Sequence, residues 1–340
     1  MKTIPSRPAG VQPRRILARL AGTLGRLRPA DLGRALVVPA LALAAFLLLW
    51  SAGASQLRTS LGALPGPVQV WEQAAALWAE HRAGRQKEAA FYQRLRKRVA
   101  AAEAAGAPPE RIARLRAHRY TGPETFIDQV LTSLATVATG FLLASLIAIP
   151  LGVVIGLNTT LYQAFNPLIQ LFKPVSPLAW LPLVTLVVSA LYAGQDGALS
   201  KAFLTSAITV TLCCLWPTLV NTAVGVAGVS KELLDVSRVL RLGWITKTVK
   251  IVLPSAVPMM FTGLRLSLGI GWMVLIAAEM LAQNPGLGKF VWDEFQNGSS
   301  NSLARIMVAI LAIGLIGFLL DRGMLALQRA VSWDRSAVLR

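Results

Sequence analysis

The chain has 340 residues, of which 54% are hydrophobic and 15% are charged, and its mean hydropathy is +0.56. Soluble domains carry about 25% charged residues, so this composition excludes an ordinary soluble protein and indicates an integral membrane protein. A formal net charge of +18 would suggest nucleic acid as the partner of a soluble chain, but basic residues in a membrane protein mark its cytoplasmic segments. We therefore expect the lipid bilayer as a partner, and no nucleic acid.

The N-terminal segment, residues 1–33, is basic, with seven Lys and Arg residues against the single acid Asp31. An apolar run over residues 34–52 follows, and it is long enough to form a first transmembrane helix. The alternative is a cleavable secretory signal that ends near residues 52–54. Because the basic segment is much longer than that of a signal peptide, we favour an uncleaved helix after a basic cytoplasmic tail.

A polar interval, residues 53–124, separates this helix from the rest of the chain. Trp71 and Trp78 lie one heptad apart, a spacing that suits an amphipathic helix at the membrane surface. Residues 81–120, interrupted at Gly106, predict a helical hairpin with eleven Lys and Arg residues. Long loops are translocated regardless of their charge, so we expect an extracytoplasmic helical insertion. It is either a docking surface for an extracytoplasmic partner or a solvated insertion.

Residues 125–329 form the predicted membrane core, in which further apolar runs reach the length of a spanning helix. They cover about residues 134–157, 167–192, 202–224, 264–281 and 306–320. The run over 167–192 contains Lys173 and is broken by prolines. With the first helix, these runs predict an all-α polytopic membrane protein with six transmembrane helices. Basic loops and a cytoplasmic tail at 330–340 predict that both termini face the cytoplasm.

Small side chains inside two of these runs favour close packing of the helices. They are Gly140, Gly152, Gly156, Gly314 and Gly317. The only cysteines, Cys213 and Cys214, are adjacent and lie inside a predicted helix. Neighbouring cysteines do not form an unstrained disulfide, and the sequence has no metal-ligand spacing. We therefore expect neither a metal site nor a cofactor site in this chain.

The connection between the fourth and fifth of the six predicted spans is the most informative part of the sequence. A short helix is predicted over residues 231–242, with Ser230 as its N-cap and Gly243 as the residue that ends it. Its apolar residues form one stripe: Leu233, Val236 and Leu240. Because so short a helix is marginal in water by itself, we expect this stripe to pack on the chain and the polar face to remain free for a partner.

The same connection contains a motif with fixed spacing. Residues 235–237, Asp-Val-Ser, are followed after three residues by Arg241, and after nine more by Ile-Val-Leu-Pro at 251–254. This pattern resembles the signature of type I ABC-importer permeases, which is EAA, three residues, G, nine residues and I-x-LP. Two positions depart from that signature, because Asp235 replaces glutamate and Arg241 stands at the glycine, with Gly243 two residues later.

Longer segments resemble the nitrate, sulfonate and taurine group of these permeases. They run over residues 167–182, 263–269 and 278–281. Two further features resemble the nitrate branch, namely the long insertion that ends at residues 120–126 and the segment at 284–297. The resemblance covers most of residues 121–329 and implies a MetI-like type I ABC-importer transmembrane domain.

The resemblance also implies how the chain would work. It implies a permease subunit of the bacterial cell inner membrane that pairs with a second permease subunit as a homodimer. Two cytoplasmic ABC ATPase subunits and an extracytoplasmic solute-binding protein would complete an importer driven by ATP. The implied substrate is nitrate, with nitrite as a second candidate. Sulfonate, taurine and cyanate are alternatives, and a secondary transporter is the alternative of another class.

The resemblance assigns a set of residues to coupling with the ATPase. They are Glu232, Asp235, Val236, Ser237, Arg238, Arg241, Gly243, Ile251, Leu253 and Pro254. The sequence has no Gly-x-x-x-x-Gly-Lys-Ser/Thr phosphate loop, so we expect no enzyme, with ATP and Mg on the ATPase subunits. A membrane enzyme is also disfavoured because the only histidines, His81 and His118, lie in the polar insertion.

Three residues are candidates for the translocation pathway: Lys173, Trp180 and Glu279. A lysine within a membrane segment is costly and can attract an anion, but near the interface it merely extends its charge into water. Glu279 ends the fifth predicted span, where a role in gating or packing fits better than contact with an anion. Trp180 is either a pathway residue or an anchor in the core or at the interface.

Overall fold

The computed structural model describes residues 29–59, 62–192, 200–299 and 301–331. Most of the two predicted cytoplasmic tails, at 1–33 and 330–340, lies outside these residues. The chain divides into two compact units. They are Met1–Thr59 with Ala63–Pro67, and Ser60–Gly62 with Val68–Arg340.

The first unit consists mainly of α2 (Pro29–Gln56). This helix contains an 18-residue apolar stretch that is long enough to cross a membrane, as the sequence predicts. The two-residue strands β1 (Arg58–Thr59) and β2 (Gly62–Ala63) follow it. The indole Nε1 of Trp50 donates a hydrogen bond of 3.2 Å to the carbonyl of Pro65. This bond ties the end of α2 to the segment that leaves it.

Four helical stretches in the described part of the second unit are also long and apolar enough to cross a membrane. They are α5 (Phe126–Leu157), α8 (Lys201–Ala227), the stretch Trp244–Ala282 that ends in α11 (Leu253–Ala282), and α13 (Ser302–Val331). With α2 they make five candidate spans among the described residues, and a bent helix pair supplies a sixth. The predicted all-α architecture with six spans is confirmed when that pair is counted as one span.

The bent pair consists of α6 (Thr159–Phe172) and α7 (Pro177–Leu191), whose axes differ in direction by 96°. The predicted run over 167–192 therefore contains a real break, and the break falls among its prolines, as expected. Helix α6 begins earlier than the run because the side chain of Asn158 accepts hydrogen bonds from two N–H groups of the first turn. Pro177 is the first residue of α7. Proline lacks a backbone N–H, and at this position an N–H would have no acceptor within the helix.

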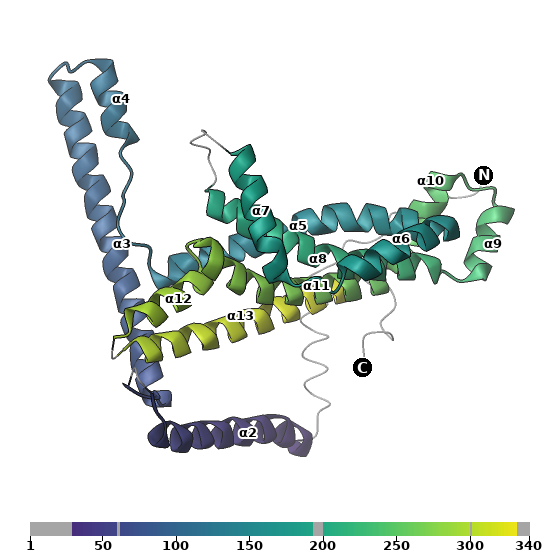
Figure 1. Cartoon of the computed structure of the whole chain (residues 1–340), viewed down its shortest axis with the longest axis horizontal. Coiled ribbons are helices and arrows are strands. Elements are labelled where there is room, and N and C mark those ends of the chain that lie inside the picture. Colours follow the sequence, from purple (N-terminus) through teal and green to yellow (C-terminus); the bar gives the residue numbers. More distant parts are fainter. Residues whose placement is uncertain (1–28, 60–61, 193–199, 300, 332–340) are drawn as a thin grey trace, which may run out of the picture. The chain divides into compact units, whose positions relative to one another are not determined.

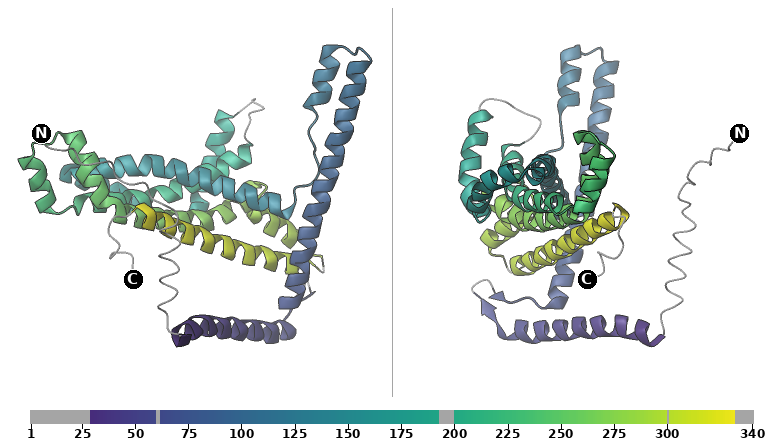
Figure 2. Two further views of the ribbon diagram at one scale, coloured as in Figure 1. Left: turned by 180° about the vertical axis from the view of Figure 1, so that it is seen from behind. Right: turned by 90° about the vertical axis from the view of Figure 1, so that its right-hand side faces the viewer.

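The core of the second unit is the contact of α8 with α5 on one side and with α11 on the other (Figures 1 and 2). Glycines make this contact close: Gly140, Gly152 and Gly156 on α5, and Gly263 and Gly271 on α11. A Cβ atom at Gly152 would lie 2.7 Å from the Cβ of Thr222, too close for two carbon atoms. The packing role predicted for the α5 glycines is confirmed. It is wrong for Gly314 within this chain, because a Cβ there would meet no atom within 4 Å.

Helices α3 (Pro67–Ala104) and α4 (Pro109–Ala117) form the predicted hairpin. The chain reverses at Gly106, whose φ of +66° lies in the left-handed region that favours glycine. Helix α3 is longer than expected, since the amphipathic helix around Trp71 and Trp78 and the first arm of the hairpin are one continuous helix. Both tryptophans are exposed on it.

We predict that Gly152→Ala destabilises the protein by about 1–3 kcal/mol, because the added methyl group forces α5 away from α8. Gly314→Ala is the matched control, since it adds the same methyl group to a helix at a position with open space. The measurement is the thermal unfolding midpoint of the purified protein in detergent. Equal midpoints for the two variants would show that α5 and α8 do not depend on this close approach.

Candidate functional site

The predicted coupling residues lie where α5 and α8 end. Helix α9 (Lys231–Val239) follows α8, and α10 (Trp244–Lys247) leads into a π-helical turn, η1 (Thr248–Val252). One apolar cluster joins these elements to the bundle: Val153, Val226, Val229, Val252 and Ala256, with Leu234 of α9 packed against it. The coupling residues therefore come together at one end of the second unit.

The predicted start of the helix over 231–242 is confirmed, because α9 begins at Lys231, but its predicted end needs correction. The helix stops at Val239, and Gly243 does not end it, because Gly243 is extended with a φ of −62° and precedes α10. Ser230 stands at the N-cap position, but its side chain makes no capping hydrogen bond. The residue that reverses the chain after α9 is Arg241, with a φ of +46°.

Two backbone hydrogen bonds explain why the reversal falls at Arg241. The N–H of Leu242 donates to the carbonyl of Ser237, and the N–H of Arg241 donates to that of Arg238, each at 3.0 Å. Together they form a Schellman motif, whose left-handed position is usually a glycine. Arg241 also occupies the glycine position of the signature. The chain thus forms this turn with an arginine at the left-handed position, where a glycine would adopt the conformation without steric strain.

The apolar stripe of α9 does not pack on the chain, contrary to the sequence prediction. Leu233, Val236 and Leu240 are 42%, 51% and 62% exposed. The buried face carries Leu234 and Ser237, and the Ser237 hydroxyl donates a hydrogen bond to the carbonyl of Leu234. Because α9 contacts the bundle only through this narrow face, the wider apolar stripe of α9 points away from the bundle.

Together with α10, this stripe forms a surface that we call the α9–α10 apolar surface. It comprises Leu233, Val236, Val239, Leu240, Trp244 and Ile245. A group of large exposed apolar side chains of this size is typical of an interaction site. Polar residues accompany it, because Glu232 is exposed, and Asp235 accepts a salt bridge of 2.8 Å from Arg238.

The α9–α10 apolar surface is connected to α11 without an intervening loop. In η1 the N–H of Leu253 donates to the carbonyl of Thr248, five residues back, which closes a π-helical turn. Pro254 follows at the start of α11, where it supplies no N–H to the helical ladder. Ile251 and Leu253 are half-buried here. A displacement of α10 is therefore passed along continuous helix into α11.

Two of the pathway candidates lie near one another, at the bend between α6 and α7. Lys173 is exposed at the end of α6, and Trp180 is half-buried in the first turns of α7. The Trp180 ring lies 6.0 Å from that of Phe172, which stacks on Trp216 at 5.8 Å. Aromatic contacts thus hold the two arms of the bend, while the lysine is accessible.

Glu279 lies apart from those two residues and is fully buried, at 0% exposure. Its carboxylate accepts hydrogen bonds from the hydroxyl of Ser133 at 2.8 Å and the N–H of Gly288 at 2.9 Å. The same hydroxyl accepts one from the N–H of Leu287 at 2.8 Å. These bonds join α11 to α5 and to the first turn of α12 (Leu287–Asn297). Sequence reasoning missed Ser133, whose position directly before the apolar run 134–157 gives no sign of this contact.

A second polar contact between spans also escaped the sequence analysis. Arg265 of α11 and Asp321 of α13 form an ion pair, with 2.8 Å between Nη2 and Oδ2. Both line a cavity of about 230 Å³ next to Trp272. Charged residues within membrane segments are costly and commonly functional. The signal was available, because Arg265 stands in a segment that resembles other permeases and Asp321 directly follows the last apolar run.

Comparison with known proteins identifies the family. Residues 148–333, more than half of the chain, match the model of the binding-protein-dependent transport system inner membrane component. The chain belongs to this family. It is a family of multi-pass inner-membrane permease subunits of ABC importers, in which the ATPase is a separate subunit and the permease carries no cofactor. The resemblance to ABC-importer permeases is therefore confirmed, and the residues predicted to couple to the ATPase lie within the matched region.

Individual relatives differ in the substrates that their names state. The nitrate import permease NrtB of Leptolyngbya laminosa is 37% identical over 57% of this chain and 64% of its own length. The bicarbonate permease CmpB of Synechocystis is 38% identical over 60% and 68%, and the taurine permease TauC of Escherichia coli is 32% identical over 62% and 74%. The matches span only about two thirds of these relatives. Sequence identity alone therefore does not decide between nitrate and bicarbonate as the substrate.

The fold also matches a solved structure, the MetNI methionine ABC transporter in its inward-facing conformations. The TM-score is 0.51 at 16% sequence identity, over 61% of this chain and 95% of the matched chain. This likeness supports the predicted MetI-like fold and nothing about the substrate. In the described ranges, no group of three or more His, Cys, Asp or Glu side chains could hold a metal ion.

We predict that Arg241→Gly stabilises the turn after α9 by about 0.5–1 kcal/mol, because glycine adopts a positive φ without strain but gains entropy in the unfolded chain. The measurement is amide hydrogen exchange at residues 241 and 242. Gly243→Ala is the control and should change exchange little, since its φ is ordinary and a Cβ there meets no atom within 4 Å. Faster exchange in Arg241→Gly than in the unmodified protein would contradict the assignment.

Proposed function

We propose that this chain is the permease of an ABC importer for a small anion, with nitrate as the first candidate, and that the α9–α10 apolar surface docks its ATPase. The observation that carries the proposal is the exposed apolar face of α9, held on a helix that is fixed to the ends of α5 and α8. A surface of this kind is destabilising in water and favourable in an interface. The position of the coupling signature within the family match supports the same assignment.

The proposed mechanism follows from the rigid connection between α9 and the spans. Closure of two ATP-bound ATPase subunits would move α9 and α10 of each permease toward the partner permease. Because η1 and α11 continue α10 without a loop, this movement would tilt α11 with it. Two permease subunits would thereby alternate between inward-facing and outward-facing states, and hydrolysis would reset them. The polar residues Glu232, Asp235 and Arg238 would fix the orientation of the ATPase.

The proposed partners are a second copy of this chain, two ABC ATPase subunits and a solute-binding protein. Solute would enter the pathway near the bend of α6 and α7, where the accessible cation of Lys173 would favour an anion and Trp180 would line the wall. Glu279 is proposed as a packing residue, because its carboxylate is enclosed by hydrogen-bond donors and does not reach solvent.

Nitrate is proposed as the substrate because the long insertion and the segment at 284–297 resemble the nitrate branch, and because relatives named for nitrate are among the most similar. Bicarbonate shares the planar shape and single charge of nitrate, and relatives named for bicarbonate are equally similar. Taurine is a larger zwitterion, and the relative named for it is less similar.

For the docking surface we predict that Val239→Asp weakens copurification of the ATPase by about tenfold or more. Burial of an unpaired carboxylate in an apolar interface costs at least about 1–3 kcal/mol. Val68→Asp on α3 is the control, since it places the same change at another exposed valine. Unchanged copurification with Val239→Asp, at equal amounts of permease in the membrane, would refute the docking assignment.

For the substrate we predict that the gene restores uptake of labelled nitrate in a strain from which it has been deleted. Labelled bicarbonate and taurine are measured in parallel, and both should remain at the level of the deleted strain. If uptake of bicarbonate or taurine is restored and uptake of nitrate is not, the proposed substrate is wrong. The assignment as a permease would stand. Uptake that persists without the ATPase would contradict the ABC importer itself.

A further inference from the structure

The hairpin of α3 and α4 is a strongly basic structure that the transport mechanism above does not use. Residues 81–120 contain eleven Lys and Arg residues and three Asp and Glu residues. The hairpin is attached at the first turn of α5, whereas α9 packs against its last turns, and α5 is about 48 Å long. The hairpin and the ATPase-docking surface thus lie at opposite ends of the second unit (Figures 1 and 2).

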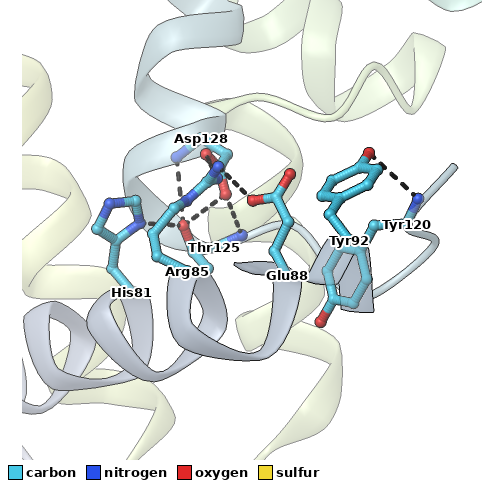
Figure 3. Close-up of polar contacts among 7 residues, drawn as sticks. All are labelled: His81, Arg85, Glu88, Tyr92, Tyr120, Thr125 and Asp128. Atoms are coloured by element: carbon cyan, nitrogen blue, oxygen red, sulfur yellow. Dashed lines mark hydrogen bonds and ion pairs between the residues drawn. The ribbon is translucent and has the colours of Figure 1, made fainter. Parts of the chain in front are cut away.

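Hydrogen bonds attach the lower part of α3 to the start of α5 (Figure 3). The Thr125 hydroxyl donates to the carboxylate of Asp128 at 2.6 Å, so the Nδ1 of His81, 2.7 Å away, must be the donor to Thr125. Arg85 forms an ion pair with the same carboxylate. Because Thr125 and Asp128 form the capping box of α5, the hairpin is bonded to the residues that begin this span.

A second attachment reaches the last span. Arg305 of α13 forms ion pairs with Glu80 of α3 and with Glu294 of α12, the latter at 2.9 Å. Glu294 also accepts a hydrogen bond of 2.9 Å from Ser302. The hairpin is therefore fixed to α5, α12 and α13 at once. A force applied to α3 is passed to two of the candidate spans.

Beyond these attachments, the hairpin contains a groove of about 270 Å³ between α3 and α4. Its apolar lining comes from Phe91, Leu95 and Leu115, and its polar lining from Arg94, Arg98 and His118. Arg94 and Arg98 lie about 14 and 20 Å further along α3 than Arg85. The groove is thus well removed from the first turn of α5.

The charges of this groove are uncompensated within the described residues. Neither Arg94 nor Arg98 forms a salt bridge there, whereas Arg116 of α4 pairs with Glu103 at 2.6 Å. Like charges four residues apart on one helix face repel each other. His118 donates from Nδ1 to the carbonyl of Arg114 at 2.8 Å, which leaves its other ring nitrogen unused by that bond. An occupant with carboxylates would relieve the repulsion, and an apolar group beside them would cover Phe91.

We propose that this groove docks an acidic and apolar surface of the solute-binding protein, with Arg94 and Arg98 as the residues that receive its carboxylates. The inference rests on the proposed function, since an importer of this kind needs such a partner. A protein fits better than a lipid headgroup, because Phe91, Leu95 and Leu115 line the groove beside the arginines, and a headgroup has no apolar surface to cover them. Docking there would act on α5 and α13 through Asp128 and Arg305.

The test compares two double charge reversals in the complete transporter with its ATPase, reconstituted in nanodiscs of zwitterionic lipid. Arg94→Glu with Arg98→Glu changes the groove, and Arg96→Glu with Lys97→Glu makes the same charge change on another side of α3. The probe is the solute-binding protein encoded beside this gene, loaded with nitrate. We expect the groove variant to bind it at least about tenfold more weakly, and the control to change affinity by less than about threefold.

Each other outcome has a definite meaning. Equal losses in both variants, or no loss in the groove variant, would overturn the groove as the docking site. A difference between the variants that appears only in nanodiscs of anionic lipid would make lipid the occupant and overturn the proposal as well. Stimulation of ATP hydrolysis by the binding protein in the unmodified transporter is the separate check. Its absence would refute the proposed function, whereas its presence with an unaffected groove variant would refute only this inference.

Discussion

The close approach of α8 to α5 and α11 is the constraint on which the rest of the second unit depends. Glycines at Gly140, Gly152 and Gly271 leave no room for a Cβ atom, so the helix axes cannot separate or slide without losing contact along their whole length. Lipid tails are as apolar as the side chains, so the hydrophobic effect does not drive helices together within a bilayer. Close packing of this kind holds them together instead. A bundle packed in this way is rigid, and it can transmit a displacement from one end to the other.

Polar contacts between the spans also fix the position of α11 relative to its neighbours. Glu279 joins α11 to α5 and α12 through Ser133 and the first N–H groups of α12, and Arg265 joins α11 to α13 through Asp321. Each bond satisfies a group that would be costly in hydrocarbon if it were left alone. Helix α11 is therefore held on three sides. It is also the helix that continues directly from the α9–α10 apolar surface, which makes it the natural element to carry movement across the bundle.

The second unit presents chemically different surfaces at its two ends. At one end α9 and α10 expose apolar side chains, and the turn between them depends on Arg241 in a strained conformation. At the other end the hairpin exposes Arg94 and Arg98 beside an apolar groove, and neither forms a salt bridge with another described residue. An apolar surface favours a stable interface, whereas a charged one favours fast and reversible encounters. This difference suits the proposed partners, an ATPase on the apolar surface and a solute-binding protein on the charged one.

The sequence by itself determined the membrane class, the positions of the spans and the coupling signature, because hydropathy and fixed spacing are local properties of the chain. It also located the break before α7 and the hairpin, since proline and glycine act on their own backbone. Only the tertiary structure decided which face of α9 is buried, that Arg241 and not Gly243 reverses the chain, and that Glu279 meets Ser133. The burial of α9 and the contact of Glu279 depend on residues far apart in sequence, and no periodicity within one helix records which neighbour it will meet. The reversal is local, but it falls at Arg241 because backbone hydrogen bonds to Ser237 and Arg238 form there, whereas residue type favours Gly243.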